Sequence, residues 1–93
     1  MKAPAPVRVR VPGLLRSYTG AADVDLPTAI GTLGAALAEL DRRYPGFRFR
    51  LIDEQGAIRP HIKLFVDGEL ARDLATALAP GGELMIVGAL SGG

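Results

Sequence analysis

The sequence predicts an α+β domain in which one main helix packs on a small mixed sheet. Three observations indicate this class. Hydrophobic residues alternate with charged ones in several segments, one central segment carries leucines at helical spacing, and turn residues separate these segments. The chain has 93 residues, enough for one domain. We expect that domain over residues 7–89, after a short flexible lead (residues 1–6) and before an extended diglycine tail (residues 90–93).

The first third of the chain has the pattern of two paired strands. Hydrophobic residues at positions 7, 9 and 11 alternate with Arg8 and Arg10, and those at 22, 24 and 26 alternate with Asp23 and Asp25. Strands so close in sequence pair most easily as an antiparallel hairpin. We therefore expect the two arginines to face the two aspartates across the hairpin.

A hydrophobic stripe at helical spacing predicts the main helix. The stripe consists of Leu33, Ala36, Leu37, Leu40 and Tyr44. Either Thr28 or Thr32 has the hydroxyl of an N-cap residue. Thr32 is preferred, because the proline and the glycine before it suit a loop. Pro45-Gly46 ends the helix.

The second half of the sequence is strand-like again. Residues 47–51 alternate phenylalanine and leucine with arginine, which predicts a strand with inward aromatic residues. Residues 61–66 alternate in the same way, and residues 84–87 form a continuous apolar run. Residues 70–78 fit either a short strand or one helical turn. The order of strands, helix and strands fits a β-grasp, although other two-layer folds share it.

Composition excludes several kinds of function. With 11 basic and 10 acidic residues the net charge is +1, which provides no general attraction to nucleic acid or anionic lipid. No apolar run approaches the roughly 20 residues of a membrane span. The absence of cysteine excludes disulfides and thiol nucleophiles. We expect a cytoplasmic protein that binds neither nucleic acid nor membranes.

The sequence also lacks the residues of a catalytic or metal site. His61 is the only histidine, and a hydrolase triad or a zinc site needs further partners in a recognisable arrangement. We interpret His61 as an ordinary strand residue. We therefore expect no metal site, no cofactor bound by this chain and no enzymatic activity of its own.

The chemically suggestive feature is the end of the sequence, Gly92-Gly93. Glycine has no Cβ, so a diglycine end can lie extended in a channel too narrow for side chains. The terminal carboxylate is ionised at neutral pH. In the active site of a partner enzyme it can attack the α-phosphate of ATP, and a sulfur or nitrogen nucleophile can then displace AMP. A chance occurrence of two glycines is the alternative.

With these features the sequence resembles the bacterial ubiquitin-like sulfur carriers. These include the small subunit of molybdopterin synthase, the carrier of thiamine biosynthesis and the thiocarboxylate carrier of cysteine synthesis. The resemblance extends from about Val7 to Gly93. It rests on the segments 11–16, 31–34 and 59–69 and on the diglycine. It implies a β-grasp fold. The ending of the chain is unlike many molybdopterin subunits, and residues 59–69 look closer to the cysteine-type carriers.

The resemblance also implies a cycle and its partners. A ubiquitin-activating-type adenylyltransferase uses ATP and Mg²⁺ to adenylate Gly93. A sulfurtransferase is a possible donor of the sulfur that forms a thiocarboxylate, and an acceptor enzyme consumes it. In this cycle Gly92 leaves the chain next to Gly93 without a side chain, whereas Leu90 and Ser91 lead the tail away from the domain. Independently, Phe65 shares strand parity with His61, so it either lies exposed on the open sheet face as a partner contact or packs under a loop.

Two other functions remain open from the sequence. A protein modifier would be joined through Gly93 to lysines of other proteins, and it needs the same free diglycine and adenylating partner. A plain binding module would have no covalent chemistry, and its tail would be incidental.

Overall fold

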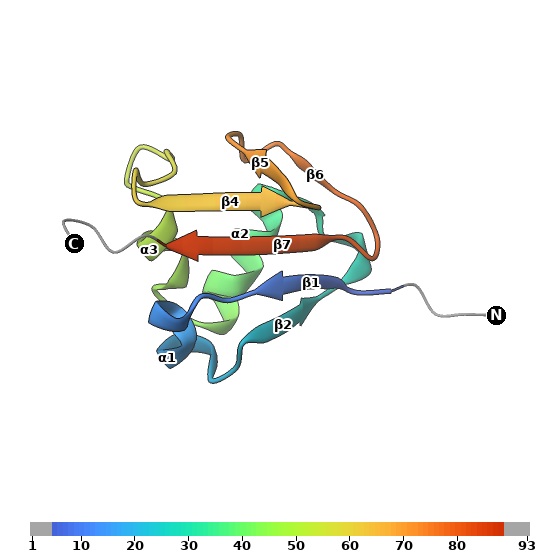
Figure 1. Ribbon diagram of the computed structural model, residues 1–93, viewed down its shortest axis with the longest axis horizontal. Helices are drawn as coiled ribbons and strands as arrows, with labels where there is room; N and C mark the ends of the chain where they lie inside the picture. The colour runs from blue at the N-terminus through green and yellow to red at the C-terminus, as the bar shows by residue number, and fades with distance from the viewer. Residues whose placement is uncertain (1–4, 89–93) are drawn as a thin grey trace.

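The computed structural model describes residues 5–88 (Figure 1). The predicted lead falls partly, and the predicted tail wholly, on residues 1–4 and 89–93, which lie outside the described residues. The strands of the main sheet are β1 (Val7–Arg10), β2 (Asp23–Leu26), β4 (Ile62–Val66), β5 (Glu69–Ala71) and β7 (Glu83–Gly88). The α-helices are α1 (Arg16–Thr19), α2 (Leu33–Arg43) and α3 (Phe47–Leu51).

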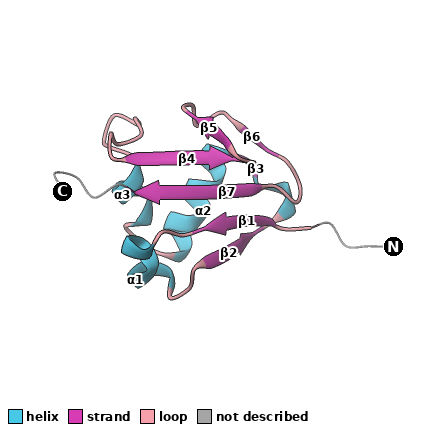
Figure 2. Ribbon diagram, viewed as in Figure 1, coloured by secondary structure: helices cyan, strands magenta, loops and turns pink. Residues whose placement is uncertain are grey.

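Within residues 5–88 the main sheet has five strands in the order β2-β1-β7-β4-β5. Strand β1 runs parallel to the last strand, β7, and the other neighbours in the sheet are antiparallel. The helices lie on one face of this sheet and leave the other face open (Figures 1 and 2). This mixed sheet grasping one main helix is the predicted β-grasp.

The N-terminal hairpin has the predicted register. Arg8 pairs with Asp25 and Arg10 with Asp23 across β1 and β2. Arg8 Nε lies 3.3 Å from Asp25 Oδ1, and Arg10 Nε lies 3.7 Å from Asp23 Oδ1. Exposed pairs of this kind contribute about 0–1 kcal/mol each, so they favour the register more than they stabilise the fold.

Helix α2 supplies the helical side of the core. Its predicted stripe is buried at Leu33, Leu37 and Leu40, together with Ala36. The preferred N-cap is also confirmed, because Thr32 Oγ1 accepts a hydrogen bond from the Ala35 amide at 3.1 Å.

No helix formed by residues 5–88 has the length and apolar character that crossing a membrane requires.

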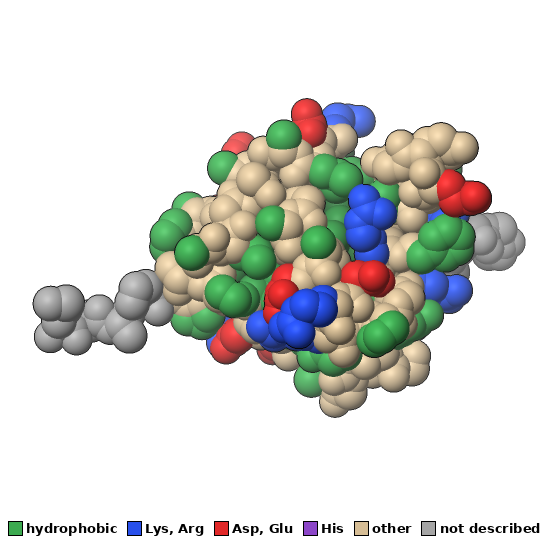
Figure 3. Space-filling view, turned by 180° about the vertical axis from the view of Figure 1, so that it is seen from behind, with side chains coloured by type: hydrophobic (Ala, Val, Ile, Leu, Met, Phe, Trp, Pro, Cys, Tyr) green, Lys and Arg blue, Asp and Glu red, His purple; other side chains and the backbone are tan. Residues whose placement is uncertain are grey.

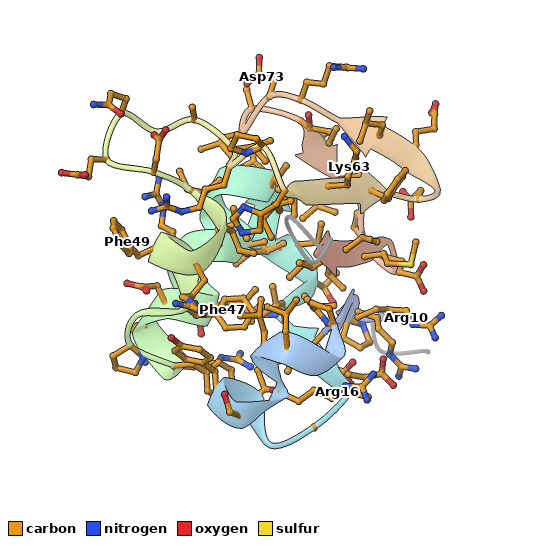
Figure 4. The ribbon with its side chains drawn as sticks, turned by 60° about the vertical axis from the view of Figure 1, so that its left-hand side comes forward. Arg10, Arg16, Phe47, Phe49, Lys63 and Asp73 are labelled. Carbon is orange, nitrogen blue, oxygen red and sulfur yellow. The ribbon has the colours of Figure 1, made fainter. Side chains whose placement is uncertain are left out.

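The strand predicted over residues 47–51 is wrong, because these residues form helix α3. Phe47 and Leu51 are fully buried four positions apart, while Phe49 is 56% exposed. Figure 4 shows Phe47 pointing into the protein and Phe49 pointing away from it. Asp41 Oδ1 accepts hydrogen bonds from the amides of Gly46 and Arg48, each at 3.1 Å. A carboxylate from α2 therefore stabilises the free amides at the start of α3.

Residues 70–78, whose pattern was ambiguous, contain strand residues at both ends. Strand β5 ends at Ala71, and β6 (Ala77–Leu78) pairs with β3 (Gly31–Thr32) in a separate two-stranded sheet. Short 3₁₀ helices, η1 (Gly13–Leu15) and η2 (Thr28–Ile30), complete the described chain.

Candidate functional site

The end of β7 is the point from which the predicted reactive tail continues. Leu90, Ser91, Gly92 and Gly93 lie outside the described residues, so their predicted roles stay predictions. Gly88, the last residue of β7, pairs with Ile62 at the start of β4. This end of β7 lies on the same side of the molecule as α1 and α3 (Figure 1). Gly88 is therefore the described residue nearest in sequence to the tail.

Leu14 of η1 lies directly against Gly88. A Cβ on Gly88 would stand 2.8 Å from Leu14 Cδ2, so only glycine allows this close approach without movement of Leu14. The Leu14 side chain is nonetheless 42% exposed. An apolar side chain thus borders the place where the chain leaves the sheet.

A groove of about 330 Å³ opens beside Leu14, and we call it the tail-exit groove. It is lined by Leu14, Phe49, Arg50, Glu54, Arg59 and His61. Helix α3, the loop after it and η1 contribute to its walls, so segments far apart in sequence meet there. The groove is one of several on the protein, and it adjoins Gly88 through Leu14. Another groove, of about 350 Å³, is lined by Gly88 itself together with Arg10, Arg16 and Asp23.

Two contacts hold Arg59 in the groove. Its Nε donates a hydrogen bond to the Phe49 carbonyl at 2.8 Å, and its guanidinium carbon lies 4.5 Å from the centre of the Phe49 ring. The stacking on the aromatic ring and the hydrogen bond to the backbone carbonyl together reduce the conformational freedom of the guanidinium. The groove therefore presents a fixed arginine beside an exposed aromatic ring.

His61, predicted as an ordinary strand residue, is exposed and directly precedes β4. Among the described residues, no group of three or more His, Cys, Asp or Glu side chains could hold a metal ion.

Phe65 lies on the open face of the sheet, where it is half-buried. It pairs in register with Leu70 on one side and Met85 on the other. Leu70 and Val87, which share this face, are 39% and 38% exposed. We call the set Phe65, Leu70, Met85 and Val87 the apolar strip. The strip favours the open-face alternative for Phe65, while its role as a partner contact stays a prediction.

Charged residues border the apolar strip. Lys63 pairs in register with Val87, and Arg10 pairs with Met85. Figure 4 shows Lys63 and Arg10 on the open-face side of the molecule. On the helix-covered face, by contrast, hydrophobic side chains are scattered, and basic and acidic groups adjoin one another (Figure 3). An apolar centre with a polar rim is the usual form of a protein interface, and the open face has this form.

The tail-exit groove was not predicted from the sequence. Phe49 was predicted to point inward because residues 47–51 were interpreted as a strand. The spacing of Phe47 and Leu51, four positions apart, was the available signal for a helix with Phe49 outside. No pattern in the sequence indicated that Leu14 and Arg59 would reach the same groove.

The β-grasp fold, with an open face that carries an apolar strip, defines a ubiquitin-like protein. The model of the ThiS family matches residues 9–93, and the chain belongs to this family. The predicted resemblance is thereby confirmed.

Individual relatives agree with the family. The sulfur carrier protein CysO of Mycobacterium tuberculosis is 34% identical over 92 residues, which cover 94% of this chain and 98% of that protein. CysO in the crystal structure of the Amycolatopsis orientalis BexX/CysO complex has a TM-score of 0.82 and 26% identity, over 94% of this chain and 99% of that chain. Small archaeal modifier protein 1 (SAMP1) of Haloferax volcanii has a TM-score of 0.79 and 28% identity, over 96% of this chain and 100% of that chain. The family and its relatives confirm the predicted sulfur-carrier function.

Proposed function

We propose that this chain carries sulfur as a thiocarboxylate on Gly93. The Gly93 carboxylate attacks the α-phosphate of ATP in an adenylating partner, which releases pyrophosphate and forms an acyl adenylate. A sulfide nucleophile then attacks the carbonyl carbon and displaces AMP, so that one carbon–oxygen bond is replaced by a carbon–sulfur bond. An acceptor enzyme of cysteine or cofactor biosynthesis consumes this sulfur and regenerates the carboxylate.

The family match carries this proposal, because it extends from residue 9 to residue 93 and so includes the diglycine. Gly92 has no side chain and allows the end of the chain to enter a narrow active site. The chain is then a co-substrate that is consumed and recycled, rather than an enzyme. ATP and Mg²⁺ belong to the adenylating partner, the sulfur donor delivers sulfur at the oxidation level of sulfide, and the cytoplasmic location stays a prediction.

We assign the docking of partner proteins to the apolar strip on the open face of the sheet. Partly exposed apolar side chains with charged neighbours are typical of surfaces that associate and separate repeatedly. The CysO relative of Amycolatopsis orientalis was crystallised in a complex with BexX, which supports a docking role for this fold. Truncation of Phe65 to Ala is expected to weaken partner binding about fivefold or more, as a central aromatic contact does.

The intact mass of the purified protein tests the carrier chemistry. The chain is co-expressed with the adenylating enzyme of its own genome and a sulfur donor. We expect a mass gain equal to the replacement of one oxygen by sulfur, localised to Gly93 by fragmentation. A variant without Gly93 is the control and should show no gain. An unchanged mass of the full chain, with an adenylating enzyme shown to be active, would contradict the proposal.

A protein modifier is the second candidate, and the similarity to SAMP1 of Haloferax volcanii favours it. Both candidates require a free Gly93 and an adenylating partner, so a search for lysine adducts distinguishes them. Diglycine-bearing lysines on other proteins, absent when Gly93 is deleted, would establish modification. If a residue appended after Gly93 left the function intact, the plain binding module would replace both candidates.

A further inference from the structure

We infer that the tail-exit groove is a second docking surface, which binds an acidic, partly apolar segment at the rim of the active site that receives the tail. This inference rests on the proposed function, because it requires an enzyme that encloses Gly93. It adds a contact on a different part of the molecule from the apolar strip.

The length of the tail brings the rim of any such enzyme close to the groove. Five residues follow Gly88, and a fully extended chain of this length spans about 17 Å at most. An active site that holds Gly93 must therefore lie within that distance of Gly88. Because Leu14 lies against Gly88 and also lines the groove, the groove lies within reach of the entrance of such an active site.

The charge of the groove indicates the chemistry of its occupant. Arg50 and Arg59 outnumber Glu54, so the lining has an excess of positive charge. Four arginines of the described protein, Arg8, Arg10, Arg42 and Arg43, take part in ion pairs. Within residues 5–88 neither Arg50 nor Arg59 does, and the groove brings these two unpaired arginines together. A carboxylate is the complementary group.

The geometry of Arg59 suits a carboxylate partner. Its Nε donates a hydrogen bond to the Phe49 carbonyl, and within residues 5–88 the two terminal amino groups of the guanidinium form no hydrogen bond. Arginine can bind a carboxylate through two parallel hydrogen bonds, and a guanidinium already held by its surroundings loses little freedom on binding. Exposed Phe49 and Leu14 add apolar contact beside it. Aromatic and arginine side chains are also the residues most often found at the energetic centre of interfaces.

Charge variants of the groove test this inference with the adenylating enzyme of the same genome. The carrier is the varied substrate, and thiocarboxylate formation is followed by intact mass. We expect Arg50→Glu and Arg59→Glu to raise KM about 5- to 20-fold with kcat unchanged within about twofold, because the contact lies away from the reacting carboxylate. Glu54→Gln should change KM in the opposite direction and lower it about twofold. It removes a negative charge that repels the acidic segment from the groove.

The control variant is Arg42→Glu, which makes the same change in net charge on the helix-covered side of the protein. Its KM should stay within about twofold of the unchanged protein. Circular dichroism shows whether each variant is folded, and Arg50→Glu alters an exposed residue with no hydrogen bond from its side chain among residues 5–88. Added salt should raise the KM of the unchanged protein more than that of Arg50→Glu.

The outcomes separate the two proposals. A mass gain in the unchanged protein, with the KM of folded Arg50→Glu and Arg59→Glu equal to that of Arg42→Glu, overturns the groove and leaves the carrier chemistry standing. A complete absence of mass gain in the unchanged protein overturns the carrier chemistry and the groove together. A raised KM in both groove variants and a lowered KM in Glu54→Gln support the groove.

Discussion

Asp67 shows how one residue fixes a connection in this sheet. It joins β4 to β5 with a φ of 49°, in the left-handed region that aspartate and asparagine tolerate better than most residues. Its Oδ1 accepts a hydrogen bond from the Glu83 amide at 2.9 Å, and its own amide donates to the Glu83 carbonyl, also at 2.9 Å. The turn is therefore attached to the start of β7, the central strand from which the tail continues.

Substitution of Asp67 separates its two roles. Asp67→Asn retains the tolerance of positive φ and an acceptor oxygen, so we expect a change of less than about 0.5 kcal/mol in the free energy of unfolding. Asp67→Ala loses the acceptor and gains backbone strain, and should cost about 1–3 kcal/mol. Urea denaturation of both variants measures the difference. Equal stability of the two variants would show that neither the acceptor nor the backbone conformation matters.

Glu39 carries the clearest electrostatic effect in the described protein. Hydrogen bonds from Arg42 and then Arg43 lower the pKa of Glu39 from 4.5 to about 2. The shortest contacts of Glu39 Oε2 are 2.7 Å to Arg42 Nη2 and 2.8 Å to Arg43 Nε. The folded state thus favours the ionised form of Glu39 more than the unfolded state does.

This pKa predicts a specific dependence of stability on pH. Because the pKa is lower in the folded state, the contribution of Glu39 is complete above about pH 4.5 and disappears as the pH falls toward 2. We expect Glu39→Gln to be less stable than the unchanged protein at pH 7, with a difference that shrinks over this range. Denaturation midpoints at several pH values measure it. Glu69→Gln, an exposed residue without an ion pair among residues 5–88, should show no such trend, and a constant difference for Glu39→Gln would refute the pairing.

At the level of elements, α3 connects the core to the tail-exit groove. Phe47 packs edge-on against Tyr18 with ring centres 5.9 Å apart, and also against Tyr44. Its neighbour two positions later, Phe49, supports Arg59 at the surface. The helix thus directs one aromatic ring into the core and the other toward the surface, which a strand with the same residues would not do.

The two phenylalanines therefore differ sharply in their expected effects. Phe47→Ala removes a fully buried ring and should cost about 3–5 kcal/mol of unfolding free energy. Phe49→Ala removes an exposed ring and its contact with Arg59, which should cost less than about 1 kcal/mol. Thermal and chemical denaturation of both variants measure the two values. Equal losses would contradict the helix and restore the strand predicted from alternation.

At the scale of the whole molecule, the buried hydrophobic residues found within residues 5–88 run from Val7 to Ile86, and strand β7 ends at Gly88. The proposed reactive residue, Gly93, follows five positions later in the sequence. We therefore predict that the fold tolerates changes at Gly92 and Gly93 that the proposed chemistry does not. This separation suits a carrier whose end must enter the active sites of other proteins.

Deletion of Gly92 and Gly93 tests this separation. We expect the free energy of unfolding to change by less than about 0.5 kcal/mol, because the buried core described within residues 5–88 keeps all its residues. Thiocarboxylate formation should be lost completely. Denaturation and intact mass are measured on the same preparation, with the full chain as the reference. A large loss of stability would show that the end of the chain contributes to the fold as well as to the chemistry.

The sequence by itself determined the hairpin, the main helix with its cap at Thr32, the strand at residues 62–66 and the apolar strand at the end. It also determined the diglycine, and with it the expected chemistry. These features were predictable because each depends on local periodicity or on a single residue type, such as the alternation around Arg8 or the leucine spacing of α2.

Only the tertiary structure decided the rest. Residues 47–51 satisfy both a strand and a helix pattern, and the choice depends on Asp41, which caps α3 from another helix. The tail-exit groove likewise brings Leu14, Phe49 and Arg59 together from separate segments. Contacts between residues distant in sequence leave no periodic signal in any one segment, so the core elements could be predicted and the groove beside the tail could not.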